Sequence, residues 1–88
     1  MIKENMTFET ISEWLQESIA KELNEKPESI SLTKSFPSFG LDSVIIVTLS
    51  VDLENWLGVE LDPTIFYEFS SIEEITNWLI ADFLPTNS

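Results

Sequence analysis

The sequence predicts an all-α protein: a four-helix bundle with a short third helix and a long first connection. Two observations support this fold class. Apolar residues recur at steps of three and four in several stretches, and the segments between these stretches are rich in Pro, Gly, Ser and Thr. The 88 residues, 43% of them hydrophobic, suffice for one modest core. We therefore expect a single domain over residues 1–88, with its core at about 7–84.

The first helix is expected from Thr7 to Asn24. Its apolar face is formed by Phe8, Ile11, Trp14, Leu15, Ile19 and Leu23. Thr7 is one candidate N-cap, and Thr10 is another, in a Thr-x-x-Glu capping box. Pro27 disfavours helical continuation past Lys26.

A long connection from Pro27 to Gly40 precedes the second helix. We expect four apolar residues to anchor it: Ile30, Leu32, Phe36 and Phe39. The second helix should begin at Asp42 or Ser43 and end at Gly58, since glycine is a common C-terminal cap.

Two further helices complete the predicted bundle. The third runs from Pro63 to about Glu68, because proline is tolerated in a first helical turn. The last follows a second capping box at residues 71–74, continues to Leu84 and stops before Pro85. Its apolar positions are Ile72, Ile75, Leu79 and Phe83.

The second helix carries two apolar stripes. At about 100° per residue, the stripe that faces the predicted core contains Ile46, Leu49, Ser50, Leu53, Trp56 and Leu57, with Ile45 near its edge. The opposite side contains Val44, Val47, Thr48, Val51 and Asn55. A solvated helix face does not normally carry three valines. We expect these valines to contact either a partner or the third helix near Ile65 and Phe66.

Composition excludes several kinds of active site. The chain has no His, Cys or Arg, which removes imidazole bases, thiol nucleophiles, Cys/His metal sites and guanidinium clamps. A small hydrolase acting through Ser43 would lack a base of the usual kind. We expect neither a catalytic residue nor a metal site.

The net charge of −12 comes from sixteen acids and four lysines, and residues 35–88 carry nine acids and no base. Such a chain repels nucleic acid and anionic membranes and attracts a basic partner. No apolar run approaches about 18 residues, and no basic region followed by an apolar stretch opens the sequence. We therefore expect no membrane span, no signal peptide and a cytoplasmic location.

The residues around Ser43 resemble a known family. The run Phe-Pro-Ser-Phe-Gly-Leu-Asp-Ser-Val at 36–44 is similar to the signature of acyl and peptidyl carrier proteins, as are downstream residues Leu49, Leu53, Glu54 and Leu57-Gly58-Val59. Residues 61–74 resemble the third-to-fourth-helix passage of polyketide-synthase carriers. The resemblance covers roughly residues 11–79 and implies an acyl-carrier-protein-like fold and a carrier function without catalysis.

In that family, the serine of a Gly-x-Asp-Ser motif is esterified by 4′-phosphopantetheine from coenzyme A, and the terminal thiol carries the acyl chain. The resemblance places the attachment on Ser43, with Asp42 and Gly40 in the same motif. By themselves, Ser43 also fits a plain helix N-cap, Asp42 a first-turn acid and Gly40 a turn residue. In carriers, Asp42 additionally contacts the transferase or its metal, and Gly40 leaves room for an approaching enzyme.

The resemblance also implies partners: a phosphopantetheinyl transferase, an acyl-loading enzyme (ligase or acyltransferase), and downstream synthase or acyl-modifying enzymes. We expect a monomer that binds them through Leu41, Val44, Val47, Thr48, Val51, Ile65 and Phe66. Many carriers have an acid where this chain has Thr48, so apolar contact should carry more of the recognition. Long-range attraction would come from Asp42, Asp52, Glu54 and Asp62.

We expect the protein to carry an acyl chain in polyketide, lipopeptide or fatty-acid biosynthesis. In one form of this hypothesis it is a loading carrier that a fatty acyl-adenylate ligase charges. A peptidyl carrier of a nonribosomal peptide synthetase remains open. A non-covalent acidic interaction module, from a different class, fits the composition but leaves the Gly-Leu-Asp-Ser motif unexplained.

Overall fold

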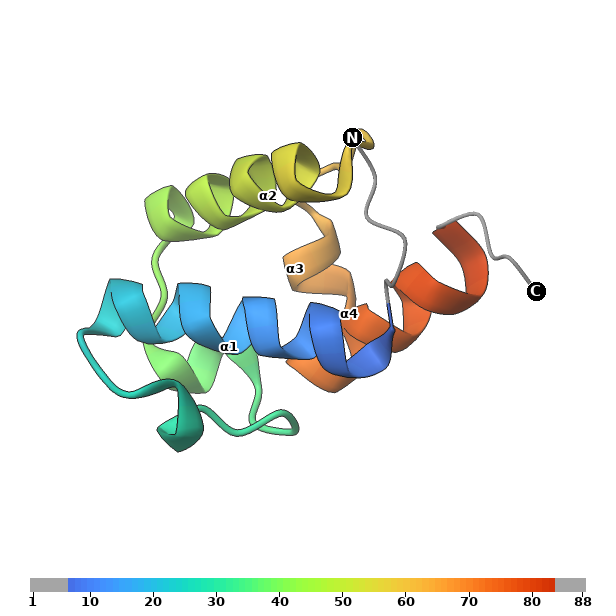
Figure 1. Ribbon diagram of the computed structural model, residues 1–88. Coiled ribbons are helices and arrows are strands. Elements are labelled where there is room, and N and C mark those ends of the chain that lie inside the picture. Colours follow the sequence, from blue (N-terminus) through green and yellow to red (C-terminus); the bar gives the residue numbers. More distant parts are fainter. Residues whose placement is uncertain (1–6, 84–88) are drawn as a thin grey trace.

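The computed structural model describes residues 7–83. Their helices are α1 (Phe8–Leu23), α2 (Ser43–Leu57), α3 (Ile65–Glu68) and α4 (Ile72–Trp78). The 3₁₀ turns η1 (Pro27–Ser29) and η2 (Phe36–Phe39) lie between α1 and α2, and a π-helical turn, η3 (Leu79–Phe83), follows α4. No strand occurs within residues 7–83. The predicted all-α bundle, with its short third helix and long first connection, is confirmed (Figure 1).

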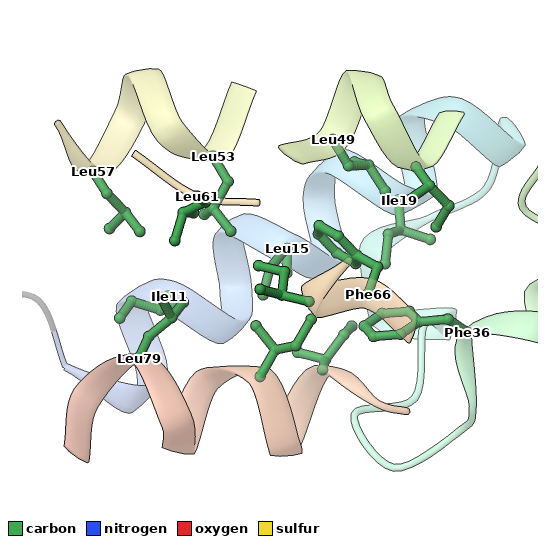
Figure 2. Close-up of a cluster of buried hydrophobic side chains, with 14 of the residues drawn as sticks. Ile11, Leu15, Ile19, Phe36, Leu49, Leu53, Leu57, Leu61, Phe66 and Leu79 are labelled. Carbon is green, nitrogen blue, oxygen red and sulfur yellow. The ribbon is translucent and has the colours of Figure 1, made fainter. Parts of the chain in front are cut away.

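The helices surround one core. In Figure 1, α1 and α2 run in opposite directions, α3 lies in the space between α2 and α4, and α4 packs against α1. Figure 2 shows side chains from these elements meeting in the middle of the bundle. Full burial of each such side chain contributes about 1.5–3 kcal/mol to folding, so α1, α2 and α4 are held mainly by their apolar faces. The buried apolar residues among those described are Ile11, Leu15, Ile19, Ala20, Ile30, Phe36, Ile46, Leu49, Leu53, Leu57, Leu61, Ile65, Phe66, Ile72, Ile75 and Leu79.

The core stripe predicted for α2 is confirmed. Five of its six members are buried: Ile46, Leu49, Ser50, Leu53 and Leu57. The sixth, Trp56, is half-buried and stacks on Trp14 of α1, with ring centroids 5.0 Å apart and planes 10° apart. Ile45 is also half-buried against the core, as its place at the stripe's edge predicts.

The ends of α1 and α2 are fixed by local caps. Thr7 caps α1, because its Oγ1 accepts a hydrogen bond from Thr10 N at 3.2 Å. The alternative prediction, with Thr10 as the N-cap, is wrong. Asn24 ends α1 in the left-handed region at φ 62°. Asp42 caps the start of α2, and Gly58, at φ 77°, caps its end. Both predicted ends of α2 are therefore confirmed.

The long connection is held by its apolar residues. Ile30 and Phe36 are buried, and Leu32 and Phe39 are half-buried against the core, so the predicted anchors are confirmed. A side chain of α1 adds a polar contact, because Gln16 Nε2 donates to the Ile30 carbonyl at 2.7 Å.

The second half of the chain departs from prediction at two places. α3 begins at Ile65 instead of Pro63, because the preceding amides close tighter turns: Ile65 N donates to Asp62 O, and Phe66 N donates to Pro63 O, both at 3.1 Å. The last helix loses its α-helical pattern after Trp78 and continues as η3. The expected end at Leu84 lies outside the described residues.

Candidate functional site

Ser43 is the first residue of α2, and its side chain is exposed. The capping role that a serine could have here belongs to Asp42, whose Oδ1 accepts a hydrogen bond from Ile45 N at 2.9 Å. Within residues 7–83 the Ser43 hydroxyl has no hydrogen-bond partner. The interpretation of Ser43 as a plain N-cap is therefore wrong, and its hydroxyl is available to another molecule.

Gly40 shapes the approach to Ser43. It ends η2 in the left-handed region, at φ 76° and ψ 25°, and its N–H donates to Pro37 O at 3.1 Å. Few residues other than glycine adopt this conformation without strain. A Cβ placed on Gly40 would meet no atom within 4 Å, so the space beside the loop is open. The interpretation of Gly40 as a turn residue is confirmed, and the open space suits an approaching enzyme.

Electrostatic contacts near this loop involve one lysine. Lys34 Nζ lies 5.0 Å from the centroid of the Phe39 ring, at the end of η2. This cation–π contact covers part of the half-buried Phe39. The last base of the sequence is therefore directed at the turn that leads into Gly40.

The second stripe of α2 faces solvent. Val44 is 71% exposed, Val47 48% and Val51 45%. The alternative in which these valines pack under α3 is therefore wrong. Thr48 is exposed as well, and its hydroxyl is turned to its own helix, where it donates to Val44 O at 2.9 Å. The four residues Val44, Val47, Thr48 and Val51, called the valine face below, are an apolar surface that begins beside Ser43.

The remaining residues expected to bind partners divide into two groups. Leu41 is half-buried and packs against the core, so part of its side chain is accessible. Ile65 and Phe66 are 4% and 2% exposed, respectively, so their assignment to the partner surface is wrong: both side chains belong to the core. α3 instead presents Tyr67, which is 67% exposed and which the sequence reasoning missed. Its position directly after two core residues of a one-turn helix was the available signal.

The acids expected to attract partners have different surroundings. Asp42 and Asp52 are exposed. Glu54 is half-buried, and its Oε2 accepts a hydrogen bond from Leu61 N at 2.7 Å, so it also holds the segment after α2. The Thr64 backbone and side chain donate hydrogen bonds that lower the pKa of Asp62 below its usual value. This shift extends the range in which Asp62 is charged toward more acidic pH.

The described residues form neither a metal-binding cluster nor a membrane-spanning helix. Between residues 7 and 83, no group of three or more acidic, His or Cys side chains is arranged to hold a metal ion. No helix in the same part of the chain is long and apolar enough to cross a lipid bilayer.

Comparison with known proteins identifies the family. Residues 13–79 match the family model described as the phosphopantetheine attachment site. The acyl carrier protein TtuC of Teredinibacter turnerae is 31% identical over 80 residues, which cover 91% of this chain and 92% of TtuC. Polyketide synthase PksL of Bacillus subtilis is 30% identical over 79 residues; this match covers 90% of the chain but spans only 2% of PksL.

A solved structure supports the same assignment. The crystal structure of a free-standing peptidyl carrier protein from an uncharacterized secondary metabolic pathway of Acinetobacter baumannii superposes with a TM-score of 0.84. The two chains are 30% identical, and the match covers 91% of this chain and all of the other. The chain therefore belongs to the family of phosphopantetheine-binding carrier proteins, which are non-catalytic and bind 4′-phosphopantetheine covalently through a serine.

The residues at the start of α2 fit this group. The exposed Ser43 offers an unpartnered hydroxyl, and no atom crowds the space beside Gly40. The first N–H groups of a helix point outward and favour a phosphate. Of these, the Ile45 N–H is already engaged by Asp42.

Proposed function

We propose that the chain is a carrier protein, folded as one domain, that is modified with 4′-phosphopantetheine on Ser43. The observation that carries this proposal is the exposed, unpartnered Ser43 hydroxyl one residue after the N-cap of α2, within the matched residues 13–79. When attached, the group supplies a terminal thiol that holds an acyl chain as a thioester. The protein itself positions the hydroxyl and presents a surface for partner enzymes.

The modification balances as a transfer from coenzyme A. The Ser43 oxygen forms a bond to the phosphorus that carries the pantetheine, and the bond from that phosphorus to the oxygen of the second phosphate breaks. Adenosine 3′,5′-bisphosphate leaves with the bonding electrons, and a base of the transferase or water takes the hydroxyl proton. This chain offers no His or Cys to take the proton.

The relatives favour an acyl cargo in polyketide assembly. TtuC is named as an acyl carrier protein and PksL as a polyketide synthase, and both align over at least 90% of this chain. An exposed valine face would suit the loading of an apolar acyl group, for example by an acyl-adenylate ligase. A role in lipopeptide or fatty-acid synthesis uses the same chemistry.

A peptidyl carrier is the second candidate function. It is favoured by the TM-score of 0.84 to the free-standing peptidyl carrier of A. baumannii. Both candidates need the same modified serine and differ in the group on the thiol. The intact mass of protein isolated from its native cell reports the arm and its cargo together, and an aminoacyl mass instead of a fatty or polyketide acyl mass would favour the peptidyl carrier.

The partners that follow from this proposal are a phosphopantetheinyl transferase, a loading enzyme and downstream synthase or acyl-modifying enzymes. We place their docking on Leu41 and the valine face, with Tyr67 of α3 added to it. The exposed side chains of this surface lie on α2 and α3, and the surrounding acids attract a basic partner. The proposal treats the carrier as a monomer.

Coexpression with a phosphopantetheinyl transferase tests the attachment. Intact mass should show one added phosphopantetheine on the unaltered chain and none on Ser43→Ala, whose helical circular dichroism spectrum should be unchanged. Ser38→Ala is the matched control, because Ser38 is also exposed and lies in the turn before Gly40. Modification of Ser43→Ala at another serine would reject the assignment. An unmodified wild-type chain would favour the non-covalent acidic module.

A further inference from the structure

The loop before Ser43 is fastened to the junction between α3 and α4. Phe36 N donates to Ser70 O at 2.8 Å, and Glu73 N donates to Leu32 O at 3.0 Å. These two backbone hydrogen bonds bind the stretch 32–36 to residues that follow it by more than thirty positions. The long connection therefore has a fixed place relative to the start of α4.

Glu74 organises this junction. Its Oε1 accepts two hydrogen bonds from one residue: from Ser70 N at 3.0 Å and from Ser70 Oγ at 3.2 Å. In a reciprocal capping box the carboxylate of Glu74 would return to the N–H of Ser71, the N-cap of α4. Here it holds Ser70 instead, the residue whose carbonyl accepts from Phe36 N.

Phe36 links the α3–α4 junction to the segment that leads to Ser43. It is 1% exposed, and its ring meets the ring of Phe66 edge to face, with centroids 5.3 Å apart (Figure 2). Phe36 begins η2, and only residues 40–42 separate the end of η2 from Ser43. These three residues can compensate for only a small displacement of η2. The direction of the Ser43 hydroxyl therefore depends on where Phe36 is held.

We propose that Glu74 is a positioning residue for the modification of Ser43, acting through Ser70 and η2. The inference rests on the proposed function, because it assumes that Ser43 is the residue modified. Glu74 does not belong to the valine face, so its loss should leave transferase docking intact. It should instead reduce the fraction of docked complexes in which the hydroxyl meets coenzyme A in reactive geometry.

The test compares Glu74→Ala with Glu73→Ala and Glu74→Gln. Glu73 is the matched control: it is exposed, adjacent and equally charged, its side chain makes no hydrogen bond within residues 7–83, and its backbone bond to Leu32 survives the substitution. Glu74→Gln is the rescue variant, because an amide oxygen accepts the same two hydrogen bonds from Ser70. Each variant is assayed with one transferase and coenzyme A, and backbone amide hydrogen exchange is measured without the transferase.

For Glu74→Ala we expect kcat to fall about fivefold at an almost unchanged KM, because a slight misplacement of a reacting group slows the reaction after docking. Exchange at the Phe36 and Ser70 amides should accelerate, while exchange at Leu49 and Leu53 in α2 stays as in the wild type. Glu73→Ala and Glu74→Gln should behave like the wild type in both measurements.

Two results would overturn the inference while leaving the proposed function intact: a wild-type kcat for Glu74→Ala, or an equal acceleration of exchange at Phe36 and in α2, which would mean general destabilisation. If Glu74→Ala does not fold, Glu74→Asp shortens the same side chain by one methylene and is held to the same expectations. A wild-type chain that is not modified on Ser43 would overturn the proposed function, and this inference with it.

Discussion

Asp42 and Ser43 are adjacent in the chain but have separate roles at the start of α2. The Asp42 carboxylate closes the helix end by accepting from Ile45 N at 2.9 Å, while the Ser43 hydroxyl has no partner within residues 7–83. Had Ser43 been the cap, modification would have removed a hydrogen bond from the helix. The division of roles lets Ser43 be modified without loss of the cap.

Substitutions at Asp42 should separate its cap from its charge. Asp42→Ala removes the acceptor for Ile45 N and should lower the free energy of unfolding by about 1 kcal/mol. Asp42→Asn keeps a side-chain oxygen and should stay close to the wild type in urea unfolding. Both variants should be modified more slowly if the carboxylate meets the transferase or its metal. Full-rate modification of Asp42→Asn would show that the negative charge has no part in the reaction.

Val51→Asp should weaken partner binding without unfolding the bundle. Val51 is 45% exposed, so the substitution removes apolar contact and adds charge at the valine face. A loss of about 1–3 kcal/mol in binding free energy is usual for an interface anchor. Asn77→Asp adds the same charge at an exposed position of α4 and serves as the control. A melted circular dichroism spectrum, or full loading of a folded variant, would contradict the docking surface.

Association with the transferase should slow as salt rises. Residues 35–88 carry nine acids and no base, and exposed charges lose their reach beyond a Debye length of about 8 Å at physiological salt. Stopped-flow measurements should place the effect in the association rate constant, with the dissociation rate constant changing less. Asp52→Asn should reduce the salt dependence, since Asp52 is exposed on α2. An association rate that is flat with ionic strength would exclude electrostatic steering.

Thr76→Val should stabilise the protein. Thr76 is fully buried in α4, and its hydroxyl has no hydrogen-bond partner within residues 7–83. An unpaired buried hydroxyl costs about 1–3 kcal/mol, and valine has nearly the same shape without that cost, so the free energy of unfolding should rise by about 1 kcal/mol. Thr48→Val is the control, because Thr48 is exposed and hydrogen-bonded to Val44 O. A destabilised Thr76→Val would indicate that the hydroxyl has a partner in solution.

Local sequence predicted α2 and most of its surroundings correctly. Its start at Ser43, its end at Gly58 and its two stripes depend on residues within about four positions of one another, and helix geometry fixes such relationships. The residue that caps its start was not predicted correctly, because the sequence offered Ser43 as the N-cap and the structure shows Asp42 in that role. The buried face of the third helix was harder to predict, because this inference also depends on periodicity within the helix. A helix of four residues has too little periodicity to define an inner face, so Ile65 and Phe66 were assigned to the partner surface when they belong to the core.

The sequence by itself therefore determined the helical class, the ends of α2 and the serine that begins it, because short-range sterics and end-residue preferences decide those features. Only the tertiary structure decided that the valine face stays open, that Tyr67 points outward, and that Glu74 reaches the Ser43 loop through Ser70 and Phe36. Those features depend on how separate elements pack, as in the Phe36–Ser70 hydrogen bond, and such contacts arise only when the apolar faces of α1, α2 and α4 close around one core.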